Sequence, residues 1–163
     1  KNATPETVGS KKERPRLDVI AMQSHVSPTY PGVAGYENAL KRFLAIADVH
    51  VSELDFSAET PEAAATAYGE YFNLLQNYGK KSAGAHKVTN VTIWGVNDEN
   101  SWINPSSSGG KKTYPLLFNI IDNVTTTKVT VTYDTGTEDL PRYDYGDSYK
   151  PNAAFSAVIN AHK

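Results

Sequence analysis

The sequence predicts an α/β fold with parallel strands, and three observations lead to this class. Three short apolar runs begin at Leu17, Val49 and Val91, and each has the length of a buried strand. Segments with apolar residues at helical spacing lie between these runs. The runs begin roughly 30 to 40 residues apart, as successive strand–helix units do. Parallel strands joined by crossover helices imply an α/β sheet or barrel.

The first unit comprises a strand over residues 17–22 and a helix over residues 36–47. The strand lies between Pro15 and the turn signal Ser27-Pro28. In the helical segment, apolar side chains recur on one face and two basic residues lie opposite them.

The second unit comprises a strand over residues 49–54 and a longer helix that ends near Gly79. Thr60 precedes Pro61 in the order favoured for an N-cap followed by the first helical residue. Gly79 is predicted to be the C′ glycine of this helix.

The rest of the chain contains a third strand, predicted over residues 91–96, and a last helix, predicted over 151–161. The segment between them departs from the strand–helix pattern. Between them, residues 123–133 end in an alternation of valine or tyrosine with threonine, which is the period of a half-exposed strand. Residues 134–136 would then form the turn of a hairpin. Residues 139–149 are expected to form an acidic, tyrosine-rich loop.

The composition excludes several classes of protein. The 163 residues suffice for one domain with a core, and a net charge of −2 without a block of basic residues argues against a nucleic-acid-binding face. The absence of cysteine excludes disulfides, thiolate nucleophiles and cysteine-based zinc sites. The four histidines lack ligand spacing, so we expect neither a metal nor another cofactor. No apolar run reaches the roughly 18 residues of a membrane-spanning helix.

Every predicted strand ends in polar residues that a purely structural strand does not need. These are Gln23-Ser24-His25, Glu53-Leu54-Asp55 and Asn97-Asp98-Glu99. In a barrel, the carboxyl ends of the strands meet at the active site, so polar residues there indicate function. Each triplet alone is equally consistent with the beginning of a loop, and it is the agreement of all three strands that favours a site.

Two carboxylates are the first candidates for chemistry. Glu53 and Asp55 are two residues apart on one strand, so their side chains point to the same side. Two anions so close disfavour each other's charge unless a proton donor lies beside them. His25, at the end of the preceding strand, is a candidate donor; a loop or core histidine bonded to backbone is the alternative.

Four motifs follow one another in the chain and carry a resemblance. They are Gln23-Ser24-His25, Ser52-Glu53-Leu54-Asp55, Trp94-Gly95-Val96-Asn97-Asp98 and Ser101-Trp102. They resemble glycoside hydrolase family ten, the endo-1,4-β-xylanases, in which Gln-x-His ends strand six, Glu-Leu-Asp ends strand seven and Trp-Gly-Val-x-Asp belongs to strand eight. The resemblance covers most of residues 16–118 and again 150–161.

The resemblance implies a fold and a set of roles. Residues 1–163 would be the C-terminal portion of a single catalytic domain, comprising strands six to eight of a (β/α)8 TIM barrel. Glu53 would be the nucleophile of a retaining mechanism, and His25 and Asp55 would hold and polarise it.

The resemblance also implies substrate-binding residues. Gln23 would lie beside the cleaved sugar, and Trp94 and Trp102 would form the walls of the same subsite. Residues 119–149 depart from the family, in which a short link leads to the last helix, and we expect them to form a β-hairpin insertion. The tyrosines of this insertion either contact substrate or cover the barrel.

The acid/base glutamate of the family, which follows an asparagine at the end of strand four, has no counterpart in this sequence. We therefore expect the chain to be one part of a larger barrel that needs a complementary N-terminal segment carrying the acid/base. The expected substrate is xylan or a xylo-oligosaccharide, and neither nucleic acid nor a membrane is an expected partner. We expect a secreted or cell-surface protein.

Two alternatives to an enzyme stay open at this point. The chain could be a carbohydrate-binding or regulatory remnant that keeps the aromatic walls without catalysis, although binding alone does not require the Glu53, His25 and Asp55 set. It could also be a purely structural α/β domain, which leaves the polar strand ends unexplained.

Overall fold

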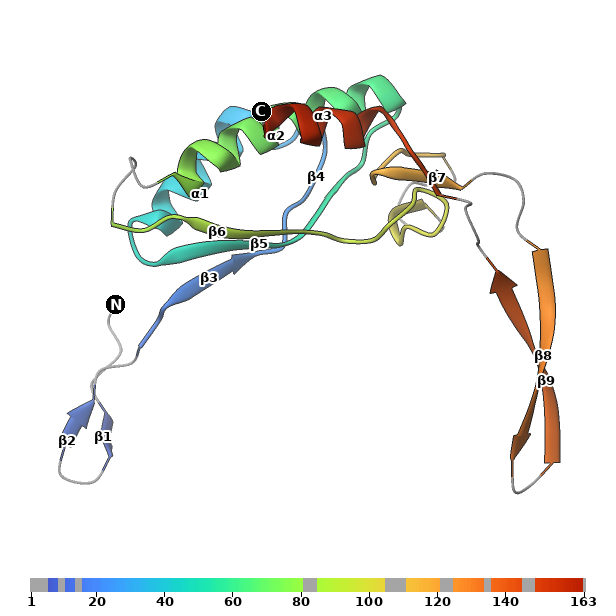
Figure 1. Ribbon diagram of the computed structural model, residues 1–163. Coiled ribbons are helices and arrows are strands. Elements are labelled where there is room, and N and C mark those ends of the chain that lie inside the picture. The colour runs from blue at the N-terminus through green and yellow to red at the C-terminus, as the bar shows by residue number, and fades with distance from the viewer. Residues whose placement is uncertain are drawn as a thin grey trace.

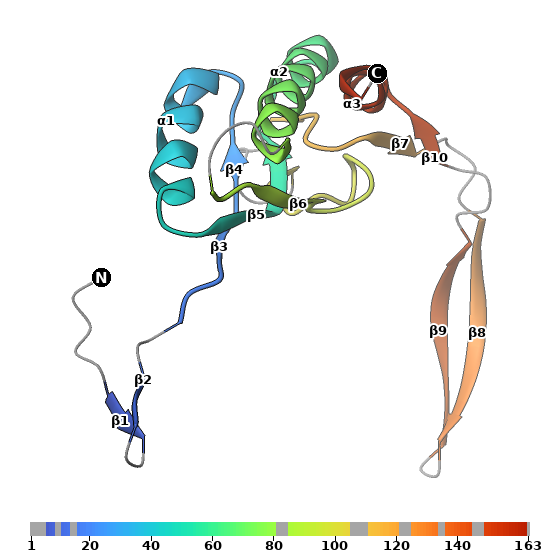
Figure 2. The same cartoon turned by 60° about the vertical axis from the view of Figure 1, so that its left-hand side comes forward.

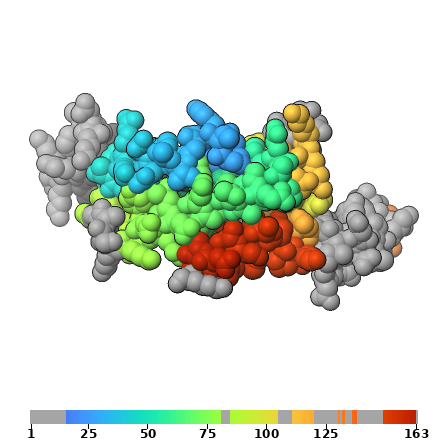
Figure 3. Space-filling view, turned by 90° about the horizontal axis from the view of Figure 1, so that it is seen from above, coloured from blue at the N-terminus to red at the C-terminus, as the bar shows by residue number. Residues whose placement is uncertain are grey.

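The computed structural model of the chain describes residues 6–8, 11–13, 16–80, 85–104, 111–120, 125–133, 136–144 and 149–162. Its body is a parallel sheet with helices packed on one face (Figure 1). The helices are α1 (Gly32–Leu44), α2 (Pro61–Gly79) and α3 (Ala153–Ala161). Seen from above, α2 lies between α1 and α3 (Figure 3).

The sheet is built around β5 (Asp48–Phe56). One side of β5 pairs first with β3 (Val19–Met22) and then with β4 (His25–Val26), and its other side pairs with β6 (Val88–Ile93). All these pairings are parallel, which confirms the predicted α/β class with a parallel sheet.

The third strand is displaced from its prediction. Residues 94–96 lie outside β6, because Gly95 has a φ of 133° that interrupts extended pairing. A Cβ on Gly95 would lie 2.7 Å from the Leu116 side chain, so the close approach of Leu116 also requires glycine.

The core lies between the sheet and the helix layer. The core residues of β5 are Val49, Val51, Leu54 and Phe56, each with no exposed surface. The Phe56 ring lies 4.6 Å from the ring of Tyr68 and 5.0 Å from that of Tyr71, both on α2. Burying each such side chain contributes about 1.5–3 kcal/mol, so this contact holds α2 on the strand that ends in the predicted site.

The N-terminus of α2 agrees with its prediction, and the C-terminus does not. The Thr60 hydroxyl accepts a hydrogen bond from Ala63 N at 3.1 Å, as predicted for an N-cap before Pro61. The prediction that Gly79 is a C′ glycine is wrong, because Gly79 is the last helical residue. A Cβ there would lie in ordinary contact distance, 3.4 Å from the Val88 carbonyl of β6.

α1 begins and ends earlier than predicted, whereas α3 begins two residues later than predicted and ends at Ala161 as predicted. α1 begins at Gly32 and ends at Leu44, whereas buried Ala47 lies in the turn that leads into β5. α3 begins at Ala153, because the Asn152 side chain caps it and accepts from the next two free backbone N–H groups.

A long hairpin follows the sheet in sequence. β8 (Thr125–Tyr133) and β9 (Gly136–Asp144) pair antiparallel along their whole length, which confirms the predicted hairpin. Residues 134 and 135 of the predicted turn lie outside the described residues. The predicted loop over 139–149 is wrong for residues 139–144, which belong to β9, because pairing with β8 outweighs their turn-like composition.

A short ladder joins the hairpin to the body. β7 (Phe118–Ile120) and β10 (Tyr149–Pro151) pair antiparallel and precede α3. The hairpin extends from this ladder away from the sheet and helices (Figure 2). A smaller antiparallel pair, β1 (Glu6–Val8) and β2 (Lys11–Glu13), lies near the N-terminus.

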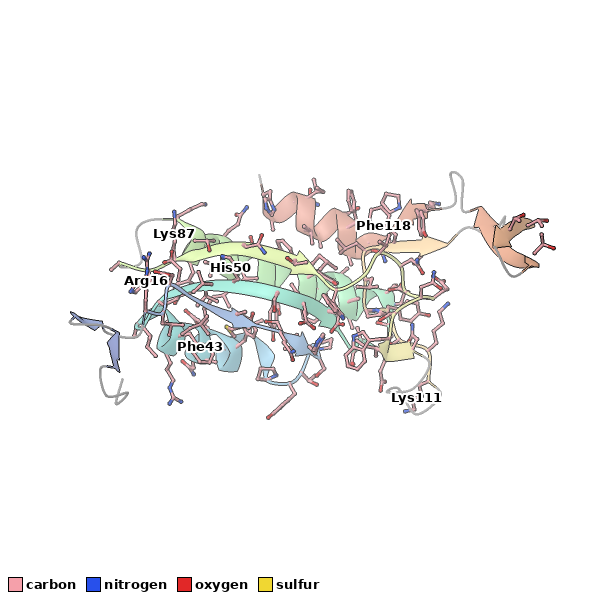
Figure 4. The ribbon with its side chains drawn as sticks, turned by 90° about the horizontal axis from the view of Figure 1, so that it is seen from below. Arg16, Phe43, His50, Lys87, Lys111 and Phe118 are labelled. Atoms are coloured by element: carbon pink, nitrogen blue, oxygen red, sulfur yellow. The ribbon has the colours of Figure 1, made fainter. Side chains whose placement is uncertain are left out.

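The face of the sheet opposite the helices carries small and polar residues. Ala21, His50 and Asn90 form one row across it, and no described helix covers this face (Figure 4). Parallel sheets normally have both faces covered. Within the described residues, the sheet is therefore half covered, and β6 and the β3–β4 side are its edges.

Candidate functional site

The predicted residues at the ends of β4 and β5 meet in one hydrogen-bonded cluster. Nδ1 of the His25 ring lies 2.9 Å from Oδ1 of Asp55, and Nε2 lies 3.1 Å from Oε2 of Glu53. One imidazole therefore bridges two carboxylates. An ionised carboxylate only accepts hydrogen bonds, so an imidazolium with both nitrogens protonated satisfies both anions at once.

Asp55 is the buried member of this cluster. Its side chain has no exposed surface, and Nε1 of Trp102 donates to its second oxygen at 2.8 Å. Burial raises the pKa of Asp55, while the hydrogen bonds from His25 and Trp102 oppose that rise. The His25 and Trp102 rings also meet edge to face, with centroids 5.0 Å apart. Asp55 thus fixes the orientation of both rings.

Glu53 is the accessible carboxylate of the cluster. Its side chain is 22% exposed, and its backbone N–H donates to the Gln23 carbonyl at 3.0 Å. His25 approaches it from the neighbouring strand. One oxygen of Glu53 is therefore held by the ring while the side chain still reaches solvent, as a group that reacts with a ligand must.

A β-bulge in β5 decides which way Glu53 points. The pairing of β5 with β3 and β4, and its pairing with β6, both gain one residue in β5 after Val51. The extra residue moves Leu54 to the helix-covered face with Val51, and it leaves Glu53 and Asp55 on the other face.

This bulge was not predicted, although the sequence contains its signal. Strict alternation places Glu53 on the same face as Val49 and Val51, which is the face toward the helices. The apolar positions change from odd at Val49 and Val51 to even at Leu54 and Phe56. Such a change of parity inside one strand indicates an inserted residue.

The other predicted binding residues lie at the same end of the sheet. Trp94 follows β6, donates its backbone N–H to Leu54 O at 3.0 Å, and is 47% exposed. Trp102 is 46% exposed despite its bond to Asp55. Gln23 is exposed and is placed through its carbonyl, which accepts from the Glu53 backbone.

A cavity of about 320 Å³ opens beside the cluster. Its lining residues are His25, Val26, Ser27, Tyr30, Ser57, Trp102 and Ile103. Exposed aromatic faces beside a polar cluster suit an amphipathic ligand such as a sugar ring. Tyr30 was missed by the sequence analysis, because nothing in the sequence distinguishes it from the other tyrosines.

Asp98, from the third polar strand end, is buried and has other partners than the cluster residues. Its Oδ1 accepts from the backbone N–H of Leu116 at 2.8 Å, and its Oδ2 has no hydrogen-bond partner among the described residues. Burial raises the pKa of Asp98 to about 6, and the Leu116 hydrogen bond opposes the rise. Its contacts link the segment after β6 to the segment before β7, so the role of Asp98 is structural.

Two kinds of site have no support in the part of the chain that the structure describes. It contains no group of three or more histidine or acidic side chains that could hold a metal ion. In the same residues, no helix is both long and apolar enough to cross a membrane.

Comparisons with known proteins point to one family. The model of glycosyl hydrolase family 10 matches residues 2–130. Endo-1,4-beta-xylanase B of Butyrivibrio fibrisolvens is 33% identical over 119 residues, which are 69% of this chain and 18% of the relative. Endo-1,4-beta-xylanase Y of Acetivibrio thermocellus is 31% identical over 143 residues, which are 83% of this chain and 12% of the relative.

Solved structures of xylanases share the fold. The CBM22-1–GH10 modules of Clostridium thermocellum endo-1,4-beta-D-xylanase 10B, complexed with xylohexaose, match with a TM-score of 0.63 at 27% identity, covering 89% of this chain and 23% of that one. The catalytic core of xylanase A matches with a TM-score of 0.62 at 18% identity, covering 91% of this chain and 41% of that one. The chain therefore spans less than half the length of each of these relatives.

Proposed function

The chain belongs to glycosyl hydrolase family 10, and on that premise we propose that it supplies the nucleophile side of a retaining endo-1,4-β-xylanase active site, with Glu53 as the nucleophile. The observation that carries this proposal is the His25 imidazole bridging an accessible and a buried carboxylate. A binding surface does not require such a set, whereas a carboxylate that must stay ionised and oriented does.

The proposed chemistry proceeds in two steps. A Glu53 oxygen bonds to the anomeric carbon of the bound sugar while the glycosidic C–O bond breaks, and the leaving oxygen takes a proton from a second carboxylic acid. Water, deprotonated by that same second group, then attacks the anomeric carbon and releases Glu53. Both steps pass through an oxocarbenium-like transition state, which a nearby carboxylate stabilises.

His25 and Asp55 act on Glu53 rather than on the sugar. Nε2 of His25 bonds one oxygen of Glu53 and so orients this carboxylate, while buried Asp55 holds the other ring nitrogen. Trp102 is fixed by its bond to Asp55 and stands beside the cavity. In this proposal Trp102, Trp94 and Gln23 contact the sugar that Glu53 attacks.

The second carboxylic acid must lie about 5–5.5 Å from Glu53 in a retaining enzyme. Asp55 does not fit this role, because both of its oxygens are engaged and buried. We assign the acid/base to a complementary N-terminal part of the barrel, on the same polypeptide or on another. The uncovered sheet face, the edge strands and the share of the relatives that the chain spans all support this larger assembly.

In this assembly the chain corresponds to strands six to eight of the TIM barrel, with residues 119–149 as a hairpin insertion. The substrate is xylan or a xylo-oligosaccharide, by analogy with the relatives, one of which is complexed with xylohexaose. Since xylan is an extracellular polymer, we propose a secreted or cell-surface location.

The test begins by supplying the missing part. Combined with an N-terminal segment of a family member that carries the acid/base, the chain should hydrolyse an aryl β-xylobioside, and without that segment it should not. In the combined protein, Glu53→Ala should lose activity by several orders of magnitude. Azide should partly restore it and give a glycosyl azide of inverted configuration, because the small anion attacks from the space that Glu53 vacates.

Glu99→Ala is the matched control, since Glu99 is an exposed carboxylate in the loop after β6. It should keep nearly normal turnover. Loss of activity in Glu99→Ala with normal turnover in Glu53→Ala would overturn the assignment. Tight xylo-oligosaccharide binding by the combined wild-type protein without turnover would favour a carbohydrate-binding remnant instead.

A further inference from the structure

The carbonyl of Met22, at the end of β3, accepts two side-chain hydroxyls. Ser52 Oγ donates to it at 3.2 Å from the bulged stretch of β5, and Ser24 Oγ donates to it at 3.4 Å from the break between β3 and β4. Ser52 lies in the bulged stretch of β5 and Ser24 lies between β3 and β4, so regular parallel pairing is interrupted at both places. The two irregular backbone segments that end in Glu53 and His25 are therefore tied to one atom.

Ser24 has an unusual backbone conformation for a residue with a side chain. Its φ is 70°, in the left-handed region, and a non-glycine residue persists there only when its surroundings hold it. Its hydroxyl lies 2.7 Å from the hydroxyl of Tyr36 on α1. Either hydroxyl can donate in this short bond; when Ser24 donates to the Met22 carbonyl, Tyr36 donates to Ser24.

Tyr36 is suited to hold this bond. It is 3% exposed, and burial raises its pKa, so the hydroxyl keeps its proton at neutral pH. The neighbouring Tyr71 offers a contrast: its ring lies 4.8 Å from that of Tyr36, but its buried hydroxyl has no hydrogen-bond partner among the described residues.

The backbone around Ser24 sets the position of the proposed catalytic groups. The carbonyl before it, that of Gln23, accepts from the backbone of Glu53 at 3.0 Å, and its own carbonyl accepts from that of Asp55 at 3.4 Å. His25 follows directly. A rotation at Ser24 would therefore move His25 relative to both of its carboxylate partners.

We propose that Tyr36 is a positioning residue. Through the Ser24 hydroxyl it holds the chain segment between β3 and β4, and it so keeps His25 between Glu53 and Asp55. This inference rests on the proposed function for its effect on turnover, but its geometric part concerns the chain alone. Tyr36 touches neither substrate nor the reacting atoms.

The first test compares Tyr36→Phe with Tyr71→Phe in the combined protein. Each removes one buried hydroxyl and keeps the ring, but only the Tyr36 hydroxyl is bonded. Tyr36→Phe should lower kcat on an aryl β-xylobioside by roughly tenfold with KM little changed, because small displacements of a catalytic group slow the chemical step. Tyr71→Phe should leave both constants unchanged. Equal effects of the two variants, or none in Tyr36→Phe, would overturn the proposal.

A double-mutant cycle tests the route through Ser24. Ser24→Ala removes the hydrogen-bond partner of the Tyr36 hydroxyl, so adding Tyr36→Phe to it should cost nothing further. Full additivity of the two effects would show that Tyr36 acts by another path, and would overturn the inference.

A spectroscopic measurement separates this inference from the proposed function. Proton and nitrogen NMR of the His25 ring in the combined protein reports its bonds to Asp55 and Glu53 without any turnover. Tyr36→Phe should shift or broaden these ring signals, and Tyr71→Phe should not. Unchanged His25 signals in Tyr36→Phe would overturn the positioning role even if Glu53 proves to be the nucleophile, and a shift would support it even if xylan is not the substrate.

Discussion

Asp55 and Asp98 lie in the same part of the fold and differ in almost everything that matters for function. Both follow or end neighbouring strands, both are buried, and burial raises the pKa of each. Asp55 gives one oxygen to His25 and the other to Trp102. Asp98 gives one oxygen to a backbone N–H and leaves the other without a partner among the described residues.

The difference teaches that a buried carboxylate with a raised pKa does not by itself indicate a site. The partners of Asp55 are side chains that reach a cavity and a second, accessible carboxylate. The partner of Asp98 is the main chain of Leu116, which links two loop segments. We therefore expect Asp55 to govern chemistry and Asp98 to govern stability.

The largest expected effect comes from exchanging each aspartate for asparagine. Asp55→Asn keeps the shape but replaces one acceptor oxygen by a donor that opposes Trp102 or His25, so the ring loses its orientation. Turnover by the combined protein should fall roughly ten-thousandfold, as for other aspartates that orient a histidine. Asp98→Asn should stay within a few-fold of normal. Similar losses in both variants, measured as kcat on an aryl β-xylobioside, would show that the two aspartates do not differ in function.

The next effect concerns the pH dependence of stability. Asp98 binds its proton more tightly when folded, since its pKa is raised from 3.8 to about 6. Its contribution to stability is therefore complete below about pH 4 and is lost as the pH rises through 6, a change of about 3 kcal/mol.

Denaturant unfolding of the wild-type chain and Asp98→Asn in the combined protein, at several pH values from 4 to 8, measures this change. The free-energy difference between the two proteins should shift in favour of Asp98→Asn as the pH rises, because only the wild type then buries a charge. Parallel stability curves would contradict the assignment.

Trp102→Phe should lower turnover less than Asp55→Asn does. Phenylalanine keeps an aromatic wall but cannot donate to Asp55, which leaves a buried oxygen with one bond fewer. We expect kcat to fall about tenfold, in line with one lost hydrogen bond to a charged group. Trp94→Phe is the comparison, since Trp94 is also proposed to contact the sugar, while the bond to Asp55 comes from Trp102. A larger loss in Trp94→Phe would make Trp94 the more important indole.

The smallest effect on turnover is expected from removing the hairpin of β8 and β9, which is joined to the body through β7, close to Asp98. Asp98 N donates to Phe118 O at 3.2 Å, and Tyr149 pairs with Ile120, so a short turn can join β7 to β10 directly. Replacing residues 121–148 by such a turn should change turnover of a small aryl xyloside by no more than a few-fold. A loss as large as that of Asp55→Asn would place the hairpin in the active site.

Local signals in the sequence were enough for most of the body. Thr60-Pro61 marked the start of α2, and three apolar runs marked β3, β5 and β6, because caps and buried strands depend on near neighbours. The prediction failed at Gly79 and at residues 139–144. At residues 139–144 a partner strand decided the structure, because β9 pairs with β8. At Gly79 the helix continues one residue further than predicted, with Lys80 as its C-cap.

The candidate site was predictable in its residues but only partly in its geometry. His25, Glu53 and Asp55 could be chosen because polar groups at parallel strand ends converge. The bond from Trp102 to Asp55 and the link from Tyr36 to Ser24 could not, because each joins segments far apart in the chain.

The central claim is that Glu53 forms the covalent bond to the sugar. A 2-deoxy-2-fluoro xylobioside with a good leaving group tests it directly. Fluorine slows both formation and release of the glycosyl-enzyme, while the good leaving group speeds only its formation, so the intermediate accumulates. Mass spectrometry of proteolysed combined protein should find one added glycosyl group, on the peptide that contains Glu53, and none in Glu53→Gln. A glycosyl group on Asp98 or Glu99, or steady turnover without any adduct, would contradict the account.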